Sequence, residues 1–475
     1  MREWQLNEIL QAVGARRPED WQAGEHFAGV FTDTRRIVPG GVFVPLSGEK
    51  FDGHNFAGLA LQGGAAAVLW ARGEVPEDLR GRVLRVADTL DAYQALGSFN
   101  CLQLGLPVVA ITGSVGKTTT KDLVKSLLSS RLKVHATPVN HNNDVGVANT
   151  LLELTPQHQV AIVEMGMRGS GQIRRLARLV RAKVGIITAI GESHLEILGT
   201  REAIAAAKAE LFEEMDSAGT AIYPGDSPYA AILRERIKGR GVSFATQPHA
   251  QGDWQLLEQR PEVSERGLGS RVRLAYPGGQ IELSYSRPGL HNASNLLAAL
   301  AACAELGLSP EELRLAIAEF QPTGMRAEVQ QLSRGITLIN DAYNAAPSSV
   351  RGGLEVMEQL AHLHGERALE QPRRRVAVLG DMLELGDDSP RFHSQIGEEC
   401  ARLGINVLVT VGDLSANFMA PAAKRGGVEC HCAADREEAW KILPQLLEPG
   451  DVVLLKASHS IGLELLAQNL QEMYK

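Results

Sequence analysis

From Leu106 onward, short apolar runs alternate with longer segments in which apolar residues recur at helical spacing. Apolar runs of about four to eight residues, bounded by turn residues, predict buried strands. Their regular alternation with helical segments is typical of a parallel α/β sheet. The expected strands of this part cover residues 106–112, 159–164 and 183–190, and the expected helices cover 117–131 and 292–306.

The rhythm is interrupted at Phe320-Gln321-Pro322-Thr323-Gly324 and then starts again. Proline and glycine interrupt helices and strands alike, so this segment predicts a domain boundary near residue 322. A further set of strands is expected beyond the boundary, at 335–341, 375–381, 406–412 and 451–456.

The first hundred residues have a different character, because they are rich in glycine and carry short apolar runs at 41–46 and 65–70. This part predicts a separate small α/β domain that ends near Gly105. The chain is therefore expected to contain three α/β domains, at 1–105, 106–322 and 323–475. Its 475 residues agree with that number, since a domain commonly spans about 150 residues.

Composition narrows the class of protein. The hydrophobic share of 44% and the charged share of 22% are those of an ordinary globular protein, which excludes disorder as the dominant state. The 48 Lys and Arg against 56 Asp and Glu leave a net charge of −8. Because there is no basic excess to neutralise phosphates, a general nucleic-acid binder is not expected.

The five cysteines are few, scattered and odd in number, which argues for a reducing compartment and against a disulfide framework. Cys430-His431-Cys432 lacks a second ligand pair and is interpreted as an incidental strand or loop. The N-terminal MREWQLNEIL does not resemble a signal peptide, and no apolar run approaches the length of a membrane span. We expect a cytoplasmic protein that is not inserted in a membrane.

The strongest chemical signal is the segment from Ile111 to Thr120, between an expected strand and an expected helix. Its glycines allow backbone N–H groups to surround phosphate oxygens, and the helix that follows offers its positive end to an anion. Lys117 is placed to reach the β- and γ-phosphates of a nucleotide, and the Thr118 hydroxyl to hold Mg²⁺. The candidate phosphate-binding residues are Gly113, Ser114, Val115, Gly116, Lys117, Thr118 and Thr119.

This short G-x-x-G-K-T loop resembles that of the Mur ligase superfamily, which includes the folylpolyglutamate synthetases. Further motifs of the family follow in family order in the second and third expected domains. They are Val163-Glu164-Met165-Gly166, Thr188 to Glu196 around His194, Ala207-Lys208-Ala209-Glu210, His291-Asn292-Ala293-Ser294-Asn295, Met325-Arg326, and Asp341 to Pro347.

The resemblance implies a small N-terminal UDP-binding domain, a central P-loop ATPase domain and a Rossmann-like C-terminal domain. Asn292, Asn295, Arg326 and Asp341 would contact ATP, with Arg326 and Asp341 acting when the C-terminal domain closes. Thr118 and Glu164 would hold one Mg²⁺, while His194 and Lys208, carbamylated by CO₂, would hold a second. Lys117, His194, Lys208 and Arg326 are accordingly the expected catalytic residues.

Two segments also indicate a particular activity within the family. Asp341 to Pro347 and Leu379 to Gly386 resemble the member that uses UDP-MurNAc-tripeptide and D-Ala-D-Ala, with an acyl phosphate as intermediate. The UDP end would contact Asp33, Thr34 and Arg35, and Asn344 is a candidate for the dipeptide. Such an enzyme is expected to be a monomer.

Alternatives stay open at this point. One is the family member that adds the third amino acid of the peptide, although its Asp-Asn-Pro-Arg motif is absent here. A folylpolyglutamate synthetase-like ligase would not need the first hundred residues, and a nucleotide-controlled switch would not need His194, Lys208 and Arg326 together. The sequence Lys456-Ala457-Ser458-His459 stands where the family has Lys-Gly-Ser-Arg, so its role is left open.

Overall fold

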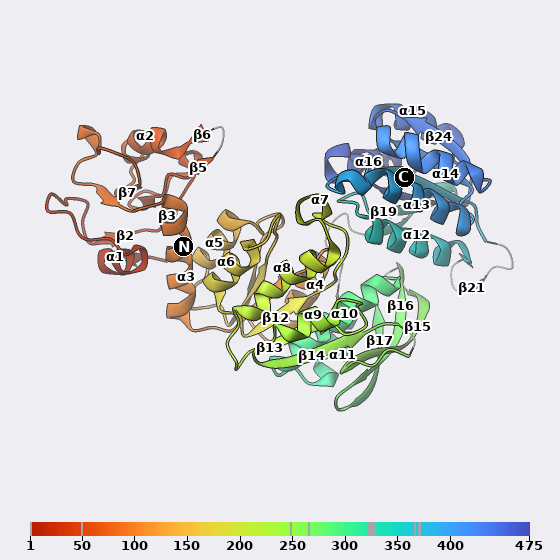
Figure 1. The fold of residues 1–475 in the computed structure, drawn as a ribbon, viewed down its shortest axis with the longest axis horizontal. Helices are drawn as coiled ribbons and strands as arrows, with labels where there is room; N and C mark the ends of the chain where they lie inside the picture. Colours follow the sequence, from red (N-terminus) through yellow and green to blue (C-terminus); the bar gives the residue numbers. More distant parts are fainter. Residues whose placement is uncertain are drawn as a thin grey trace.

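Three larger sheets, one in each part of the chain, organise the molecule (Figure 1). The computed structural model describes residues 2–48, 51–247, 249–264, 267–320, 328–364, 367–368 and 372–475. The N-terminal unit lies at one end, the central unit in the middle, and the C-terminal unit at the other end (Figure 1). The α/β class and the three-part organisation expected from the sequence are thus confirmed.

The N-terminal unit is built on a four-stranded parallel sheet in the order β3-β4-β7-β8. Consecutive residues of β4 face opposite sides of this sheet, so Val42 packs with Trp4 and Leu84, whereas Phe43 packs with Phe31. Its elements are β1 (Trp4–Gln5), α1 (Leu6–Val13), β2 (His26–Phe27), β3 (Val30–Phe31), η1 (Thr34–Arg36), β4 (Val42–Phe43), β5 (Ser47–Gly48), β6 (Phe51–Asp52), η2 (Gly53–Phe56), α2 (Ala57–Gln62), β7 (Ala67–Trp70), η3 (Glu77–Leu79), β8 (Val83–Arg85) and α3 (Thr89–Leu104).

Helix α3 joins this unit to the central one. Its Tyr93 and Leu96 share a buried cluster with Ala148 and Leu152 of helix α5 (Asp144–Leu152). At Gly97 the two helices approach so closely that a Cβ would lie 2.8 Å from the carbonyl oxygen of Ala148. The predicted boundary near residue 105 therefore falls just after a helix that already packs on the central unit, and its position stays a prediction.

The central unit contains a nine-stranded sheet in the order β10-β11-β9-β12-β13-β14-β15-β16-β17. The strands from β10 to β15 are parallel, and β15, β16 and β17 form antiparallel hairpins. The elements are β9 (Val108–Thr112), α4 (Lys117–Ser129), β10 (Val134–Ala136), α5, β11 (Val160–Glu164), α6 (Gln172–Val180), β12 (Val184–Ile187), α7 (Leu195–Leu198), α8 (Arg201–Glu213), β13 (Thr220–Pro224), α9 (Ala230–Glu235), β14 (Arg240–Ala245), β15 (Trp254–Ser264), β16 (Gly267–Tyr276), β17 (Gly279–Tyr285), α10 (Leu290–Glu305) and α11 (Pro310–Ala318).

Both faces of this sheet are covered by helices, which explains why β9 reads as a continuous apolar run. Val108 and Ala110 pack with residues of α5, α6 and α8, whereas Val109 and Ile111 pack with residues of α4, α10 and α11. The expected strands 106–112, 159–164 and 183–190 are found as β9, β11 and β12. The expected helices are found as α4 and α10.

The C-terminal unit has a six-stranded sheet in the order β18-β19-β25-β22-β23-β24, parallel apart from β18. The four strands expected here are found as β19, β22, β23 and β25, and Cys430 to Cys432 lie in β24. The elements are β18 (Glu328–Gln331), η4 (Ser333–Gly335), β19 (Thr337–Asn340), α12 (Pro347–Ala361), β20 (Leu363–His364), β21 (Arg367–Ala368), β22 (Arg375–Gly380), η5 (Gly386–Asp388), α13 (Ser389–Arg402), β23 (Val407–Val411), η6 (Ser415–Met419), α14 (Ala420–Arg425), β24 (Glu429–Ala433), α15 (Arg436–Leu446), β25 (Val452–Lys456), η7 (His459–Ile461) and α16 (Leu463–Met473).

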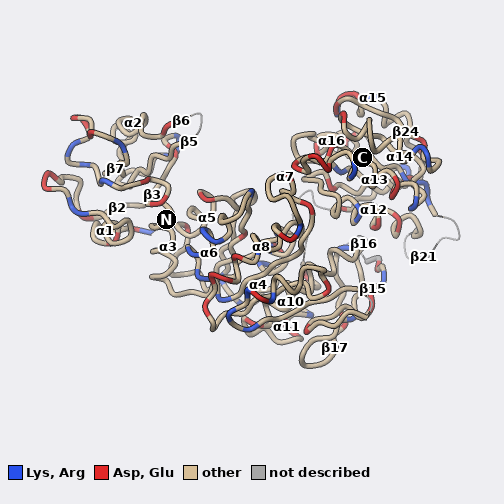
Figure 2. Tube along the Cα trace, viewed as in Figure 1, with Lys and Arg blue, Asp and Glu red and all other residues tan. Residues whose placement is uncertain are grey.

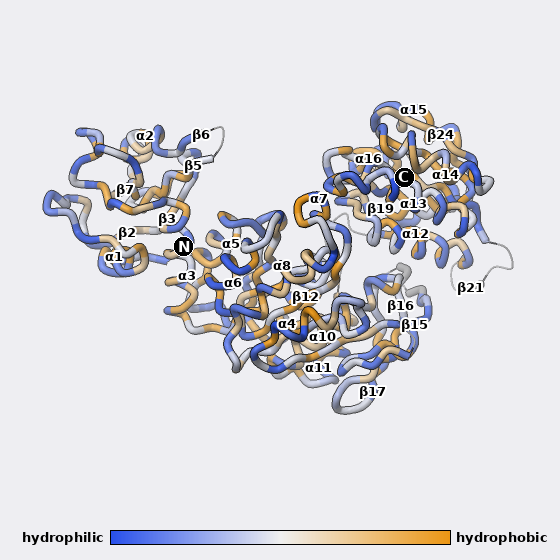
Figure 3. The backbone as a smooth tube through the Cα atoms, viewed as in Figure 1, coloured by the Kyte–Doolittle hydropathy of each residue, from blue (hydrophilic) through white to orange (hydrophobic). Residues whose placement is uncertain are grey.

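Charged residues of both signs are spread over the whole molecule, and one short helix is notably apolar. Figure 2 shows Lys and Arg interspersed with Asp and Glu over all three units. In Figure 3 the short helix α7 stands out as apolar beside the C-terminal unit. The side chain of its Ile197 is 58% exposed, and the helix contacts η5 of the C-terminal unit. None of the helices in the described ranges combines the length and the apolar character that a membrane crossing requires.

Candidate active site

Strand order explains why residues distant in sequence meet at one place. Strand β9 lies between β11 and β12, and the three strands are parallel. Their carboxyl ends therefore share one edge of the sheet, which is where ligands bind in open α/β sheets. At that edge β9 leads into the loop 113–116, β11 ends at Glu164, and β12 leads toward His194.

The loop after β9 adopts a conformation that requires glycine at Gly116. This residue has a φ of 85°, in the left-handed region, and a Cβ there would collide with Oδ1 of Asn295 on α10. The loop is also fixed from β12, since Thr188 Oγ1 donates a hydrogen bond of 2.5 Å to the Val115 carbonyl. Ser114 N donates to the Ala189 carbonyl at 2.8 Å. Two neighbouring elements thus hold the loop around the start of α4.

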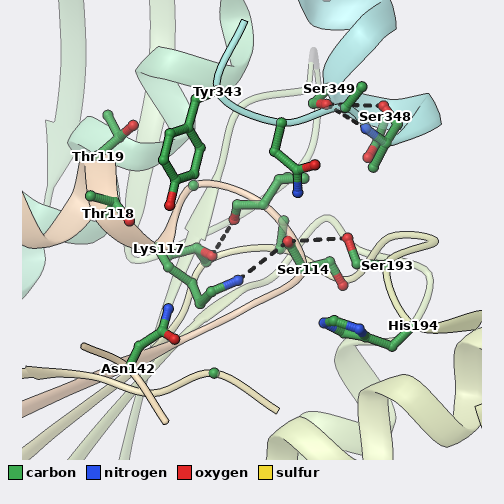
Figure 4. Close-up of a pocket in the computed structure, with 18 of the residues that line it drawn as sticks. Ser114, Lys117, Thr118, Thr119, Asn142, Ser193, His194, Tyr343, Ser348 and Ser349 are labelled. Carbon is green, nitrogen blue, oxygen red and sulfur yellow. Dashed lines mark hydrogen bonds between the residues drawn. The ribbon is translucent and has the colours of Figure 1, made fainter. Parts of the chain in front are cut away.

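Lys117 and Thr118 begin helix α4 and point into the site (Figure 4). Lys117 Nζ donates to the Gly113 carbonyl at 2.8 Å, which folds the side chain back over the loop. Thr118 Oγ1 donates to Glu164 Oε2 at 2.8 Å. The hydroxyl and the carboxylate expected to share a metal ion are therefore in direct contact.

The Glu164 carboxylate is held from several directions. It is 4% exposed, its Oε1 accepts a hydrogen bond of 2.9 Å from Asn142 Nδ2, and its Oε2 lies 3.9 Å from Lys121 Nζ. A buried carboxylate is costly unless it is paired in this way. The Glu164 carboxylate is therefore buried and held in place, and does not face solvent at the end of the strand.

Thr118 and Glu164 fit a magnesium ion. Mg²⁺ prefers oxygen ligands and commonly binds through one or two carboxylates together with waters and substrate phosphates. A hydroxyl and a carboxylate 2.8 Å apart beside a phosphate-binding loop match that preference. The described part of the chain contains no cluster of three or more His, Cys, Asp or Glu that could hold a metal on its own.

His194 lies at the start of α7, with a φ of 66°. Burial, followed by the charges of Lys208, Lys117 and Arg168, lowers its pKa to about 4. The imidazole is therefore neutral near pH 7, the form that can offer a nitrogen lone pair to a metal. Its ring lies near Ser193, whose Oγ donates to the Ser114 carbonyl at 3.3 Å (Figure 4).

Lys208 is 1% exposed and lies on helix α8. Burial, with a smaller effect from the charge of Lys117, lowers its pKa well below the usual value. Burial of a lysine in this way favours its neutral amine over the ammonium. Lys208 therefore does not lie on an exposed face of the alanine-rich helix α8.

The C-terminal unit supplies the opposite wall of the site, and the cleft between the two units has a volume of about 940 Å³. Asp341 Oδ2 lies 2.5 Å from Nζ of Lys456, which is 2% exposed and also donates to the Asn344 carbonyl at 2.9 Å. The ring of His459 lies 5.6 Å from that of Tyr343. Tyr343 in turn hydrogen-bonds through its hydroxyl to Asn140 of the central unit.

The structure brings most of the predicted site residues to this cleft. Those that line it are Ser114, Val115, Gly116, Lys117, Thr118, Thr119, Glu164, His194, Asn292, Asn295, Asp341 and Asn344. Asn292 and Asn295 lie inside α10, which begins at Leu290, so they are not caps of that helix. Lys208 lies behind the lining residues, close enough to Lys117 and His194 for their charges to interact.

The remaining predicted residues lie elsewhere. Asp33, Thr34 and Arg35 belong to the N-terminal unit, where Arg35 Nη2 pairs with Asp33 Oδ2 at 2.7 Å. The hydrogen bonds from Arg35 lower the pKa of Asp33 to about 2. Arg326 lies outside the described residues, so its predicted role is untested by the structure.

Several lining residues were not individually assigned to the site from the sequence. They are Asn140, Asn142 and Asn143 in the loop after β10, Ser193, Ser348 and Ser349 near the start of α12, Glu384, and Lys456. A signal for the first group was present, because Asn140-His141-Asn142-Asn143 is a dense polar cluster just before a helix. Lys456 was noticed without a role; the structure shows it paired with Asp341.

Comparison with known proteins was made on the whole chain. Three family models match it: "Mur ligase family, catalytic domain" at residues 26–99, "Mur ligase middle domain" at 111–303, and "Mur ligase, glutamate ligase domain" at 325–459.

Among curated relatives, the UDP-N-acetylmuramoyl-tripeptide–D-alanyl-D-alanine ligase of Bacillus subtilis (strain 168) is 37% identical over 453 residues, covering 94% of this chain and 93% of the relative. A crystal structure of MurF from Acinetobacter baumannii superposes with a TM-score of 0.87 at 30% identity and covers 99% of both chains. MurF from Thermotoga maritima, in complex with ADP, gives a TM-score of 0.80 at 25% identity, with 94% of this chain and 97% of that one covered.

Proposed function

The chain belongs to the Mur ligase family, and on that basis we propose that it is an ATP-dependent ligase that joins D-alanyl-D-alanine to UDP-N-acetylmuramoyl-tripeptide. The observation that carries the proposal is the cleft in which the phosphate-binding loop and Glu164 face Asp341 and Lys456 of a second unit. Relatives with this activity in their names match the chain along nearly its full length. The product would be the UDP-linked pentapeptide of peptidoglycan synthesis.

The chemistry of amide formation explains why such a cleft is needed. A carboxylate is a poor electrophile, because its charge repels an amine and oxide is not a viable leaving group. The terminal carboxylate of the tripeptide would attack the γ-phosphate of ATP, which gives an acyl phosphate and ADP. The dipeptide amine would then attack the carbonyl carbon, and phosphate would leave from the tetrahedral intermediate.

In this scheme the loop residues Gly113 to Thr119 bind the phosphates of ATP, and Lys117 neutralises the β- and γ-phosphates. Positioning and charge neutralisation supply most of the catalysis in phosphoryl transfer. Asn295 supports the loop through its contact with Gly116, and Asn292, Asp341 and Arg326 are proposed nucleotide contacts. Asn344 is proposed to contact the dipeptide.

Thr118 and Glu164 are proposed to hold one Mg²⁺, and His194 with Lys208 a second. Bound there, magnesium would supply positive charge between two mutually repelling anions, the acceptor carboxylate and the γ-phosphate. An ammonium cannot ligate a cation, and an amine nitrogen suits Mg²⁺ poorly because the ion prefers oxygen ligands, so Lys208 would first be changed chemically. Its neutral amine can attack CO₂ to form an N–C bond as one C–O π bond opens, and the nitrogen then loses a proton, which leaves a carbamate whose single negative charge is shared by two oxygens.

The burial of Lys208 supports this carbamate in two ways. A lowered pKa increases the share of the unprotonated, nucleophilic amine at any given pH. The neighbouring Lys117, whose charge interacts with Lys208, would then stabilise the carbamate anion once it forms. The same burial that makes an ammonium costly thus favours the modification.

The N-terminal unit, proposed to span residues 1–105, would bind the UDP end of the substrate through Asp33, Thr34 and Arg35. It lies on the far side of the central unit, proposed as 106–322, from the C-terminal unit, proposed as 323–475 (Figure 1). Binding energy released at the UDP end can position a carboxylate at the distant reacting centre. The proposed substrates, ATP and a UDP-linked peptide, also point to a cytoplasmic enzyme. We propose that it acts as a monomer, because one chain supplies both walls of the cleft.

Phosphate release tests the proposal. The protein is incubated with ATP and UDP-MurNAc-tripeptide, with and without D-Ala-D-Ala, and both phosphate and the UDP-linked pentapeptide are measured. We expect sustained phosphate release in equal amount to the pentapeptide only when all three substrates are present. Sustained phosphate release without the dipeptide would contradict the proposal. So would sustained phosphate release when a single amino acid replaces the dipeptide.

A further inference from the structure

A carboxylate of the C-terminal unit faces His194 across the cleft. Oε2 of Glu384 lies 3.0 Å from Nδ1 of His194, and the two side chains are 51% and 19% exposed. His194 follows β12 of the central sheet, whereas Glu384 follows β22 of the C-terminal sheet. Both residues line the cleft, so their contact is made only where the two units meet.

The loop that carries Glu384 is built to present this side chain. Glu384 has a φ of 62°, a left-handed conformation that a long side chain rarely adopts. On one side of it, Met382 N donates to His393 Nε2 and Leu383 N donates to Ser458 Oγ, each at 3.0 Å. Met382 and Leu385 are buried in the C-terminal core. The flanking residues thus anchor the loop and hold a strained residue outward, which is a common feature of functional sites.

The opposite side of the cleft accommodates this loop closely. Gly386 follows Glu384 with a φ of 59°, and a Cβ there would lie 3.1 Å from Cα of Glu196 on α7. Helix α7 is the short apolar helix that begins directly after His194 (Figure 3). The Glu384 loop therefore rests on the segment that sets the position of the His194 ring.

A carboxylate at one ring nitrogen is how a metal-ligating histidine is usually oriented. The carboxylate accepts a hydrogen bond from the N–H of that nitrogen, which fixes the tautomer. The lone pair of the other ring nitrogen is then free to bind the metal. Here the facing nitrogen is Nδ1, which would leave Nε2 for the site around the phosphate-binding loop. In the present arrangement the two atoms are at ion-pair distance, but Nδ1 forms no aligned hydrogen bond within the described residues.

We propose that Glu384 is a positioning residue for His194. When the C-terminal unit docks, the Glu384 carboxylate accepts a hydrogen bond from Nδ1–H of His194 and directs Nε2 toward the bound phosphates. This inference rests on the proposed function, because it assigns Glu384 to the ligand site proposed for His194. It also gives domain docking a chemical consequence, since the histidine is oriented only while the two units are together.

The test uses three substitutions of Glu384 and a control in the same loop. Glu384→Ala removes the acceptor, Glu384→Gln keeps an uncharged acceptor, and Glu384→Gly removes both the side chain and the backbone strain. Asp387→Ala is the control, because Asp387 is exposed and forms no hydrogen bond or ion pair within the described residues. Each variant is assayed for kcat, KM for ATP and thermal unfolding, and for Mn²⁺ binding by electron paramagnetic resonance with a non-hydrolysable ATP analogue.

We expect Glu384→Ala to lower kcat and to weaken the second Mn²⁺ site by about 10- to 100-fold, the usual effect of losing such a partner. KM for ATP should change less than about twofold, since uniform substrate binding is not affected. Glu384→Gln should keep more activity than Glu384→Ala. Glu384→Gly should match Glu384→Ala in activity without a lower unfolding temperature, which separates positioning from folding. Asp387→Ala should resemble the wild type in all four measurements.

A double-mutant cycle separates this inference from the function on which it rests. If Glu384 acts through His194, adding Glu384→Ala to His194→Ala should cause no further loss of kcat. Additive losses would show that Glu384 acts by itself, for example as a direct ligand, and would overturn the inference. So would wild-type kcat and Mn²⁺ binding in Glu384→Ala. If His194→Ala itself retains full ligase activity, the proposed role of His194 fails and not merely this inference.

Discussion

Replacing Gly116 by alanine tests whether contact with Asn295 fixes the phosphate-binding loop. Gly116 has a φ of 85°, where an L-residue costs roughly 1–2 kcal/mol. The new Cβ would also come closer than 3.0 Å to Oδ1 of Asn295, the limit that real Cβ atoms respect. Such overpacking typically costs about 1–3 kcal/mol. Together the two effects predict a cost of about 2–5 kcal/mol. This cost lowers the free energy of unfolding or, if the loop moves to relieve the clash, the free energy of nucleotide binding.

Gly105→Ala is the matched control. Gly105 is also left-handed, with a φ of 62°, but nothing lies within 4 Å of a Cβ added there. It should lose roughly 1–2 kcal/mol of unfolding free energy and bind ATP normally. Urea denaturation and calorimetric titration with a non-hydrolysable ATP analogue measure both quantities. Asn295→Ala should partly restore Gly116→Ala, because it removes the colliding oxygen. Equal stability and equal ATP affinity in Gly116→Ala and Gly105→Ala would refute the reasoning.

Three further predictions concern charged and titrating groups at the cleft. Lys117→Ala should lower ATP-dependent ligation by at least about 10²-fold, the usual effect of removing one donor to developing charge, and an unchanged rate of pentapeptide formation would exclude its assigned role. Lys208→Ala should be comparably impaired and partly rescued by a short carboxylic acid such as formate or acetate, measured as ligation rate; full activity without rescue would exclude the carbamate. His291 has Nδ1 buried without a partner in the described residues, and burial lowers its pKa from the usual 6.5 to about 4. Since the unfolded chain binds this proton more tightly, the free energy of unfolding should fall by up to about 3 kcal/mol as the pH drops from 6.5 to 4. His291→Asn should flatten that part of the pH profile of urea denaturation, and an unaltered slope would show that His291 does not cause it.

Local pattern was sufficient to predict much of the central and C-terminal sheets. Strand β9 and helix α4 were predicted because a buried parallel strand is apolar throughout and the Gly-Lys-Thr loop marks the start of the helix. The hairpins β15 to β17 were not predicted. Their outer residues are polar, with Arg271 paired to Glu262 and Glu282 across strands, so no continuous apolar run signals them.

The parts of the site that could be predicted are those that a short segment of the sequence identifies by its motif. Lys117 and Thr118 were predicted from the glycine-containing loop between a strand and a helix, whereas Glu164, the last residue of β11, was predicted from the resemblance to the family. The burial of Lys208 could not be read from helix α8, because its alanine-rich surroundings suit either an exposed or a buried face. Contacts between units, such as Glu384 with His194, depend on how two separate sheets dock, and no local pattern contains that information.

Isotope transfer tests the central claim, that the tripeptide carboxylate is activated by phosphorylation, most directly. UDP-MurNAc-tripeptide labelled with ¹⁸O in its terminal carboxylate is converted with ATP and D-Ala-D-Ala, and the released phosphate is examined by mass spectrometry. Passage through an acyl phosphate moves one labelled oxygen from each carboxylate into phosphate for every amide formed. Pentapeptide formation with unlabelled phosphate would contradict the account, because the carboxylate oxygen would then never have been bonded to phosphorus.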